Sequence, residues 1–166
     1  MGTVRSLSLS VVAFVAAAVV VQAGEQQAAK SDPRVKALLE ELEVKYTVDK
    51  DGDYRVINSF EDGRSQLVFV NSNTSKLATM EIREVWSVGY LSEGTVSPAV
   101  ARNLLLENGR VKIGGWQLSR FSGKEAGVFR AQIKADCDAR TLLLTLHAVS
   151  QTADEKEKEL VGGDDL

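Results

Sequence analysis

The stretch YRVINSFEDGRSQLVFV, residues 54–70, decides the fold that we predict for this chain. Two runs rich in β-branched, aromatic and other apolar residues, 54–57 and 66–70, lie on either side of the turn residues 61–64. Such runs form strands, and an Asp-Gly pair between them favours a tight turn. The run 66–70 is apolar almost throughout, which predicts a strand in the centre of a sheet.

The residues before this stretch predict a helix and a first hairpin. Asp32 followed by Pro33 is a typical helix start, because Asp accepts from a free backbone N–H and proline suits the first turn. The next apolar residues share one helix face by their spacing: Val35, Leu38, Leu39 and Leu42. Residues 46–48 and 54–57 then surround an Asp-Gly turn at 49–52, which predicts an antiparallel hairpin.

The residues after this stretch predict a loop, a strand and a second helix. We expect a polar loop at 71–75 and a strand at 82–91. One side of that strand carries Ile82, Trp86, Val88 and Tyr90, and Glu84 interrupts it, so the strand is expected to bend or to lie at an edge. Ser97-Pro98 predicts a helix to about residue 107, with an apolar face of Val100, Leu104 and Leu105.

The last third of the chain predicts a second hairpin and a third helix. Residues 113–121 and 127–134 form the hairpin, and Asp136 or Asp138 caps the helix. Its apolar stripe is Leu142, Leu146, Val149 and Ala153. The predicted order is helix, three or four strands, helix, two strands, helix. This order gives an α+β domain with one antiparallel sheet and the helices on one of its faces. We place the domain at 32–161, with an acidic tail at 162–166.

The N-terminus has the three parts of a secretory signal peptide. Arg5 is followed by an apolar run to Val21, and small residues precede a cleavage point after Ala23. We therefore predict a signal peptide at 1–23, a flexible leader at 24–31, and a mature protein in the bacterial periplasm or outside the cell. An uncleaved membrane anchor is the alternative, although the run is shorter than the roughly 20 residues that a spanning helix needs.

The charges and the reactive side chains exclude several function classes. The formal net charge of the 166 residues is −3, without a cluster of basic residues, which argues against nucleic acid as a partner. Cys137 and His147 are the only residues of their types, so we expect no metal, no cofactor and no catalytic pair. The acidic turn at 49–53 lacks the spacing of a calcium-binding EF-hand loop and is interpreted as a hairpin turn.

Three aromatic residues are candidates for binding a partner. Trp86, Tyr90 and Trp116 are large and apolar, and Trp is enriched at the centres of interfaces. Packing in the core is the alternative for the two tryptophans. The tripeptide Asn73-Thr74-Ser75 also matches a glycosylation sequon, which matters only in a host that glycosylates such sites.

The order of several short motifs resembles the YbjN-type family, described as putative bacterial sensory transduction regulators. The motifs follow one another over residues 32–160: 35–39 with Tyr46 and Val48, 51–56, 64–70, 84–87, 104–108, 114–118 and 153–155. The resemblance implies a fold like that of type III secretion chaperones, which are small α+β dimers that hold extended segments of client proteins. It implies no reaction. The export signal departs from the many relatives that look cytoplasmic.

We therefore expect a chaperone-like, non-catalytic binding or regulatory protein that binds a protein or peptide through a sheet edge or a helix face and forms a homodimer. Two alternatives stay open. One is an envelope enzyme that uses carboxylates, for which Glu81, Glu84, Asp136 and Asp138 are the nearest residues. The other is an adaptor held in the membrane by an uncleaved N-terminus.

Overall fold

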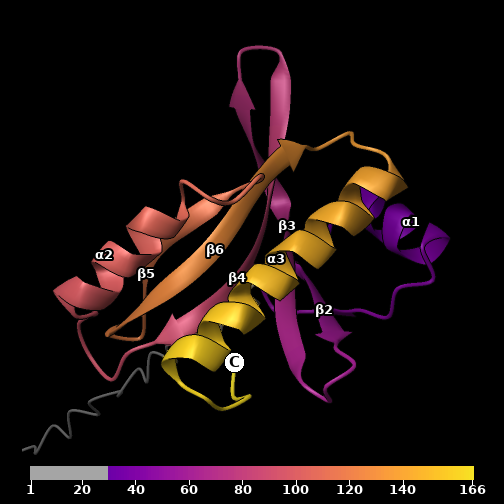
Figure 1. Cartoon of the computed structure of the whole chain (residues 1–166). Helices are drawn as coiled ribbons and strands as arrows, with labels where there is room; N and C mark the ends of the chain where they lie inside the picture. Colours follow the sequence, from indigo (N-terminus) through magenta and orange to yellow (C-terminus); the bar gives the residue numbers. More distant parts are fainter. Residues whose placement is uncertain (1–29) are drawn as a thin grey trace, which may run out of the picture.

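A computed structural model describes residues 30–166, in which three helices pack against one six-stranded antiparallel sheet (Figure 1). The predicted signal peptide and residues 24–29 of the leader lie outside the described residues. The elements are α1 Pro33–Glu41, β1 Thr47–Val48, β2 Tyr54–Ser59, β3 Ser65–Leu77, β4 Met80–Leu91, α2 Pro98–Glu107, β5 Gly115–Phe121, β6 Lys124–Lys134 and α3 Ala139–Leu160. The strand order is β1-β2-β3-β4-β6-β5, so β1 and β5 lie at the two edges.

Each helix begins at a polar residue that caps it, as predicted. The side chains of Asp32, Ser97 and Asp138 accept hydrogen bonds from backbone N–H groups in the first turns of α1, α2 and α3. Of the two residues proposed for α3, Asp138 is therefore the cap. Pro33 and Pro98 occupy the first helical positions, where their missing N–H groups cost nothing.

The helices cover one face of the sheet, which confirms the predicted α+β class. Buried residues alternate along the strands, for example Val68 and Val70 in β3 and Phe129 and Ala131 in β6. They pack with the predicted stripe of α3: Leu142, Leu146, Val149 and Ala153. Figure 1 shows α3 running across the middle of the sheet, with α1 beside the start of α3 and α2 near β5.

The predicted loop at 71–75 is wrong, because these residues belong to β3. The strand extends to Leu77 and pairs with β4 as an arm that projects beyond the rest of the sheet (Figure 1). Backbone hydrogen bonds between the two strands hold the arm together, so its polar side chains need no core. A polar sequence alone does not distinguish such an arm from a loop.

Two further expectations fail on details of packing. Strand β4 lies in the centre of the sheet, between β3 and β6, and not at an edge. The polar Glu84 is accommodated because its side of β4 faces away from the helices, while Val85 on the other side is fully buried. In α2, Leu104 is buried, but Leu105 is 67% exposed, because only a narrow stripe of this helix contacts the sheet.

None of the helices in residues 30–166 is long and apolar enough to cross a membrane.

Candidate functional site

The β2 edge of the sheet is only partly covered. Strand β1 pairs with Tyr54 and Arg55 alone, and the rest of β2 has no neighbour on this side within the described residues. The bond from Phe60 N to Arg64 O closes the β2–β3 turn, so every second residue of β2 bonds to β3. By this alternation, the N–H and C=O groups of Ile57 and Ser59 point away from β3 and are free to bond to another strand.

The short β1 results from a turn at the end of α1. Glu43 has a φ of 54°, in the left-handed region that a residue with a side chain adopts at a cost. The next residue, Val44, donates its N–H to Leu39 O at 2.9 Å, which holds the chain against α1. The chain therefore joins β2 only at Thr47 and leaves the edge beyond Arg55 open.

A groove of about 610 Å³ lies beside this open edge, between β2 and α3. Its lining is mainly apolar: Val44, Val56, Ile57, Val68, Leu143, Leu144 and Leu146, with Glu43, Lys45, Asn58 and His147 as polar members. Ile57, Leu143 and Leu144 are 68%, 44% and 56% exposed, so apolar surface is open to solvent here. We call this site the β2 groove.

The other edge, at β5, is protected at its start. Asn108, which follows α2, accepts a hydrogen bond from Trp116 N at 2.6 Å and donates one to Trp116 O at 3.3 Å. The amide side chain thus makes both bonds that an added strand would make at this residue. Since unpaired edges invite pairing with other chains, Asn108 shields the start of β5.

The three aromatic candidates lie in three different environments. Trp116 is 3% exposed and packs in the core, with its ring 5.3 Å from that of Phe129. Tyr90 follows a bulge in β4 and pairs with Gly127, whose missing side chain leaves room for Leu104 of α2. Trp86 lies on the sheet face that the helices leave uncovered. The structure therefore does not bring these residues together.

Trp86 belongs to a stack of rings on the uncovered sheet face. Its ring lies 4.2 Å from Phe69 and 6.0 Å from Phe121, nearly parallel to both. The guanidinium groups of Arg55 and Arg130 lie 5.8 Å from Phe69 and Trp86 respectively. Because the faces of the Trp86 ring are already covered, the stack is better suited to shielding the sheet than to binding an incoming ring.

Cys137 and His147 do not form a catalytic pair. Cys137 lies two residues before α3 and His147 lies in the middle of this helix, and the helical stretch from Ala139 to His147 alone covers about 12 Å. Burial raises the pKa of the Cys137 thiol, which keeps it protonated and weakly nucleophilic. His147 instead lines the β2 groove.

The four carboxylates proposed for an enzyme occupy separate places. Glu81 binds Arg34 at 2.8 Å, and hydrogen bonds from Arg34 and Thr74 lower its pKa to about 2. Glu84 pairs with Arg130 on the uncovered face, at 2.9 Å. Two more are engaged near α3: Asp136 with Lys134, and Asp138 as the helix cap. These four residues do not converge in a cleft.

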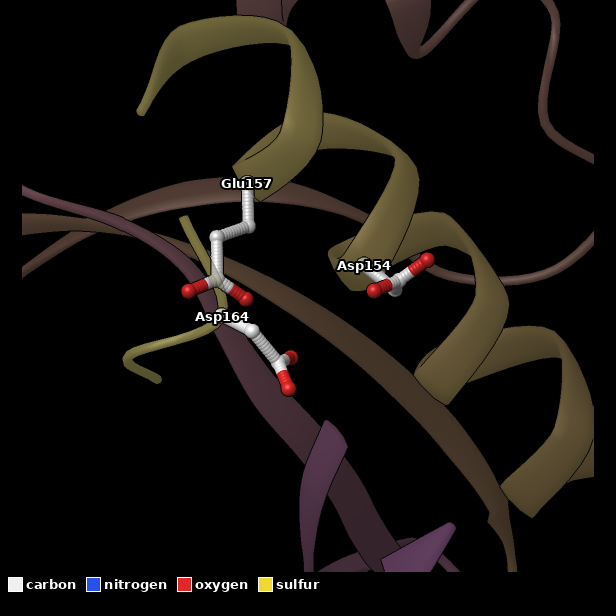
Figure 2. A group of neighbouring side chains, drawn as sticks. All are labelled: Asp154, Glu157 and Asp164. Carbon is white, nitrogen blue, oxygen red and sulfur yellow. The ribbon is translucent and has the colours of Figure 1, made fainter. Parts of the chain in front are cut away.

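A different acidic cluster joins α3 to the tail. Figure 2 shows Asp154 and Glu157 of α3 near Asp164, with oxygen atoms close enough to surround a cation. The positive charge there belongs to Arg64, which lies 2.6 Å from Asp154 and 3.4 Å from Glu157. Glu157 also accepts from Asp165 N and Leu166 N. The cluster therefore holds the predicted acidic tail against the domain.

The acidic turn before β2 is a hairpin turn, as predicted. Asp49 accepts hydrogen bonds from the N–H groups of Asp51 and Asp53, and Gly52 has a φ of 82° that favours glycine. Asp53 caps Ser72 N at 2.7 Å. Its carboxylate therefore covers part of the edge at the base of the arm.

The sequence reasoning missed the β2 groove. Leu143 and Leu144 were available as a signal, because both are apolar and lie off the predicted stripe of α3. The unpaired part of β2 gave no such signal. Where β1 joins β2 depends on the turn at Glu43, which no sequence pattern indicated.

Of the comparisons with known proteins, the one with solved structures finds a match. No family model matches the sequence, and no curated protein does. Among solved structures, the chain is similar to the crystal structure of YbjN, a putative transcription regulator from E. coli. The similarity covers 75% of this chain and 86% of that one, with a TM-score of 0.46 and 7% identity. This structure bears the name of the family that the motif order resembles.

Proposed function

We propose that this chain is a non-catalytic binding protein that takes up an extended segment of a partner protein along the open edge of β2. The observation that carries the proposal is the combination of free backbone groups at Ile57 and Ser59 with an apolar groove beside them. Backbone bonds to a sheet edge provide affinity for any extended chain, and pockets for alternate side chains provide selectivity.

The geometry defines which side chains enter the groove. A partner residue opposite Ile57 shares its orientation and points away from the helices. Its two neighbours lie opposite Val56 and Asn58 and point toward α3, into the β2 groove. We therefore expect a preferred segment to carry apolar residues two positions apart.

The N-terminal signal supports a place of action outside the cytoplasm of a bacterium. The resemblance to chaperone-like dimers supports a homodimer, and α2 and β5 offer exposed leucines for one: Leu105, Leu106 and Leu118. Light scattering tests this part. A mass of two chains at micromolar concentration supports the dimer, and a mass of one chain contradicts it.

Paired proline substitutions test the binding site. Ile57→Pro and Leu118→Pro each remove one N–H that points out of the sheet, the first from β2 and the second from β5. The probe is a fluorescent seven-residue peptide in which leucine alternates with threonine between two lysines. In the chain that starts at Gly24, we expect Ile57→Pro to weaken binding at least tenfold and Leu118→Pro to leave it unchanged.

A control peptide of the same composition, with its leucines adjacent, should bind more weakly. Thermal melts verify that both proline variants are folded. Equal binding to the wild-type chain and the Ile57→Pro variant contradicts the proposal, as does a complete lack of binding.

A further inference from the structure

The open edge of β2 is self-complementary. Its free N–H and C=O groups belong to Ile57 and Ser59, two positions apart on the same side of the strand. In an antiparallel pair, two residues that lie opposite each other with such groups exchange both backbone hydrogen bonds. When β2 of a second copy lies antiparallel beside this edge, Ile57 of each copy can face Ser59 of the other. Every free group of the two edges then has a partner.

We infer that two copies of this chain pair in this way while no partner segment is bound, about a two-fold axis at Asn58. The contact is isologous, since both copies contribute the same residues, and it closes on itself. This inference rests on the proposed function, because the second copy uses the backbone groups that we assign to a partner segment. The second copy is therefore a competitor that regulates access to the β2 groove.

Exposed apolar side chains favour the pairing. Ile57 is 68% exposed on the face away from the helices, and in this register the two Ile57 side chains are diagonal neighbours across the strand pair. On the helix side the two β2 grooves become continuous, and Leu143 and Leu144 of both copies border the joined groove. The pairing removes apolar surface of Ile57 from water, which stabilises the contact.

The charges at the two ends of this contact are complementary. In this register the β2–β3 turn of the second copy reaches the start of β1, with its Glu61 level with Arg55. Lys45, two residues before β1, borders the β2 groove at this point. The side chains of Glu61, Arg55 and Lys45 are exposed, and within residues 30–166 none of them is in an ion pair. Opposite charges therefore meet at both ends of the pair, which favours this register over others.

The size of the contact determines when it forms. It involves residues 57–59 of each β2, a short edge by comparison with stable interfaces. We therefore expect it at concentrations well above micromolar. The contact proposed for α2 and β5 lies at the opposite edge of the sheet and is independent of it. A longer partner segment makes additional contacts in the groove and displaces the second copy, so self-pairing protects the open edge when such segments are scarce.

Sedimentation equilibrium of the chain that starts at Gly24 tests the inference. Between about 10 µM and about 1 mM, we expect the average mass to rise toward twice its value at the lowest concentration. Lys45→Glu and Glu61→Lys each bring like charges together and should weaken this association about tenfold. The double variant Lys45→Glu, Glu61→Lys reverses both charges and should recover most of the association.

Two further variants serve as controls. Lys50→Glu matches Lys45→Glu in its change of net charge, and Lys50 is exposed in the β1–β2 turn, away from the open edge. We expect Lys50→Glu to leave the association unchanged. Ile57→Pro removes an outward N–H and should abolish the rise in mass. Thermal melts verify that each variant is folded.

Addition of the alternating leucine peptide separates the inference from the proposed function. If the mass rises with concentration, charge reversal restores the association and the peptide lowers the mass, both stand. If the mass does not rise, or if Lys45→Glu associates like the wild-type chain, the inference is wrong, and the proposed function stands when the peptide binds the wild-type chain and not Ile57→Pro. If the mass rises as expected but the peptide neither binds nor lowers it, the copies pair through β2 and the proposed function fails.

Discussion

The two edges of the sheet differ in whether their outward-pointing backbone N–H and C=O groups have a partner. At β5, the side chain of Asn108 satisfies the N–H and C=O of Trp116, and α2 lies alongside. At β2, the left-handed turn at Glu43 keeps β1 short and leaves Ile57 and Ser59 uncovered next to an apolar groove. Asn108 shields the start of one edge and a left-handed turn exposes the other, a difference that supports the proposal that the open edge serves binding.

The largest expected effect concerns the core beside the protected edge. Trp116→Ala should lower the free energy of unfolding by about 3–5 kcal/mol, because a large buried aromatic side chain is lost. Urea titration measures the change. Trp86→Ala, on the uncovered face, should cost less than half as much. An equal loss of stability for both variants would show that the ring stack belongs to the core, and would contradict the different roles given to Trp116 and Trp86.

Removing the shield should make the β5 edge resemble the β2 edge. Asn108→Ala deletes two hydrogen bonds to Trp116, which we expect to cost about 1–2 kcal/mol. The freed edge should also pair with other chains, seen as self-association by analytical ultracentrifugation. Gln117→Ala, an exposed change on the same strand, is the control. If Asn108→Ala loses no stability and keeps the oligomeric state of the unsubstituted protein, the role given to Asn108 is contradicted.

Acid should weaken the contact between α1 and the arm. Burial raises the pKa of Asp32, but hydrogen bonds from Arg34 and Arg83 outweigh it and hold the pKa well below its usual range. For Glu81, bonds from Arg34 and Thr74 lower the pKa from 4.5 to about 2. Depressed carboxylate pKa values contribute stability above the unfolded-state pKa, and this contribution is lost as the pH falls.

Stability should therefore fall between about pH 4.5 and pH 2, as followed by thermal melts. Glu81→Gln should flatten this dependence, because it removes one of the titrating groups. Glu93→Gln is the control, since Glu93 is exposed and has a single surface ion pair with Lys124. An unchanged pH profile in Glu81→Gln would contradict the assignment.

The smallest expected effect concerns the turn that keeps β1 short. Glu43→Gly should raise the free energy of unfolding by up to about 1 kcal/mol, because glycine adopts the left-handed conformation without strain. Glu41→Gly, within α1, should lower it by a similar amount. If Glu43→Gly destabilises the chain as well, the turn is not strained and the account of the short β1 is wrong.

The sequence was sufficient for the elements that local chemistry determines. The caps at Asp32, Ser97 and Asp138, the stripe of α3 and the two hairpins follow from turn residues and apolar spacing. The sequence was not sufficient to predict structure or burial that depends on contacts between residues far apart in the chain. The polar arm at 71–77 forms a strand because β4 pairs with it, and Leu105 is exposed because α2 turns it away from the sheet.

The candidate site was the least predictable part, because it consists of unused backbone groups. Sequence patterns identify large side chains, and they indicated Trp86, Tyr90 and Trp116, which the fold distributes over different environments. An open edge depends on where a neighbouring strand ends. Only the observed register of β1 against Arg55 and Tyr54 locates the two free residues of β2.

The most direct test of the account is a cross-strand measurement on the complex. With the alternating leucine peptide bound to the chain that starts at Gly24, NMR should show peptide protons close to the amide of Ile57 and slowed exchange at Ile57 and Ser59. The amide of Leu118 on β5 should not change. Contacts of the peptide with the uncovered face around Trp86, with Ile57 and Ser59 exchanging as in the free protein, would contradict the account.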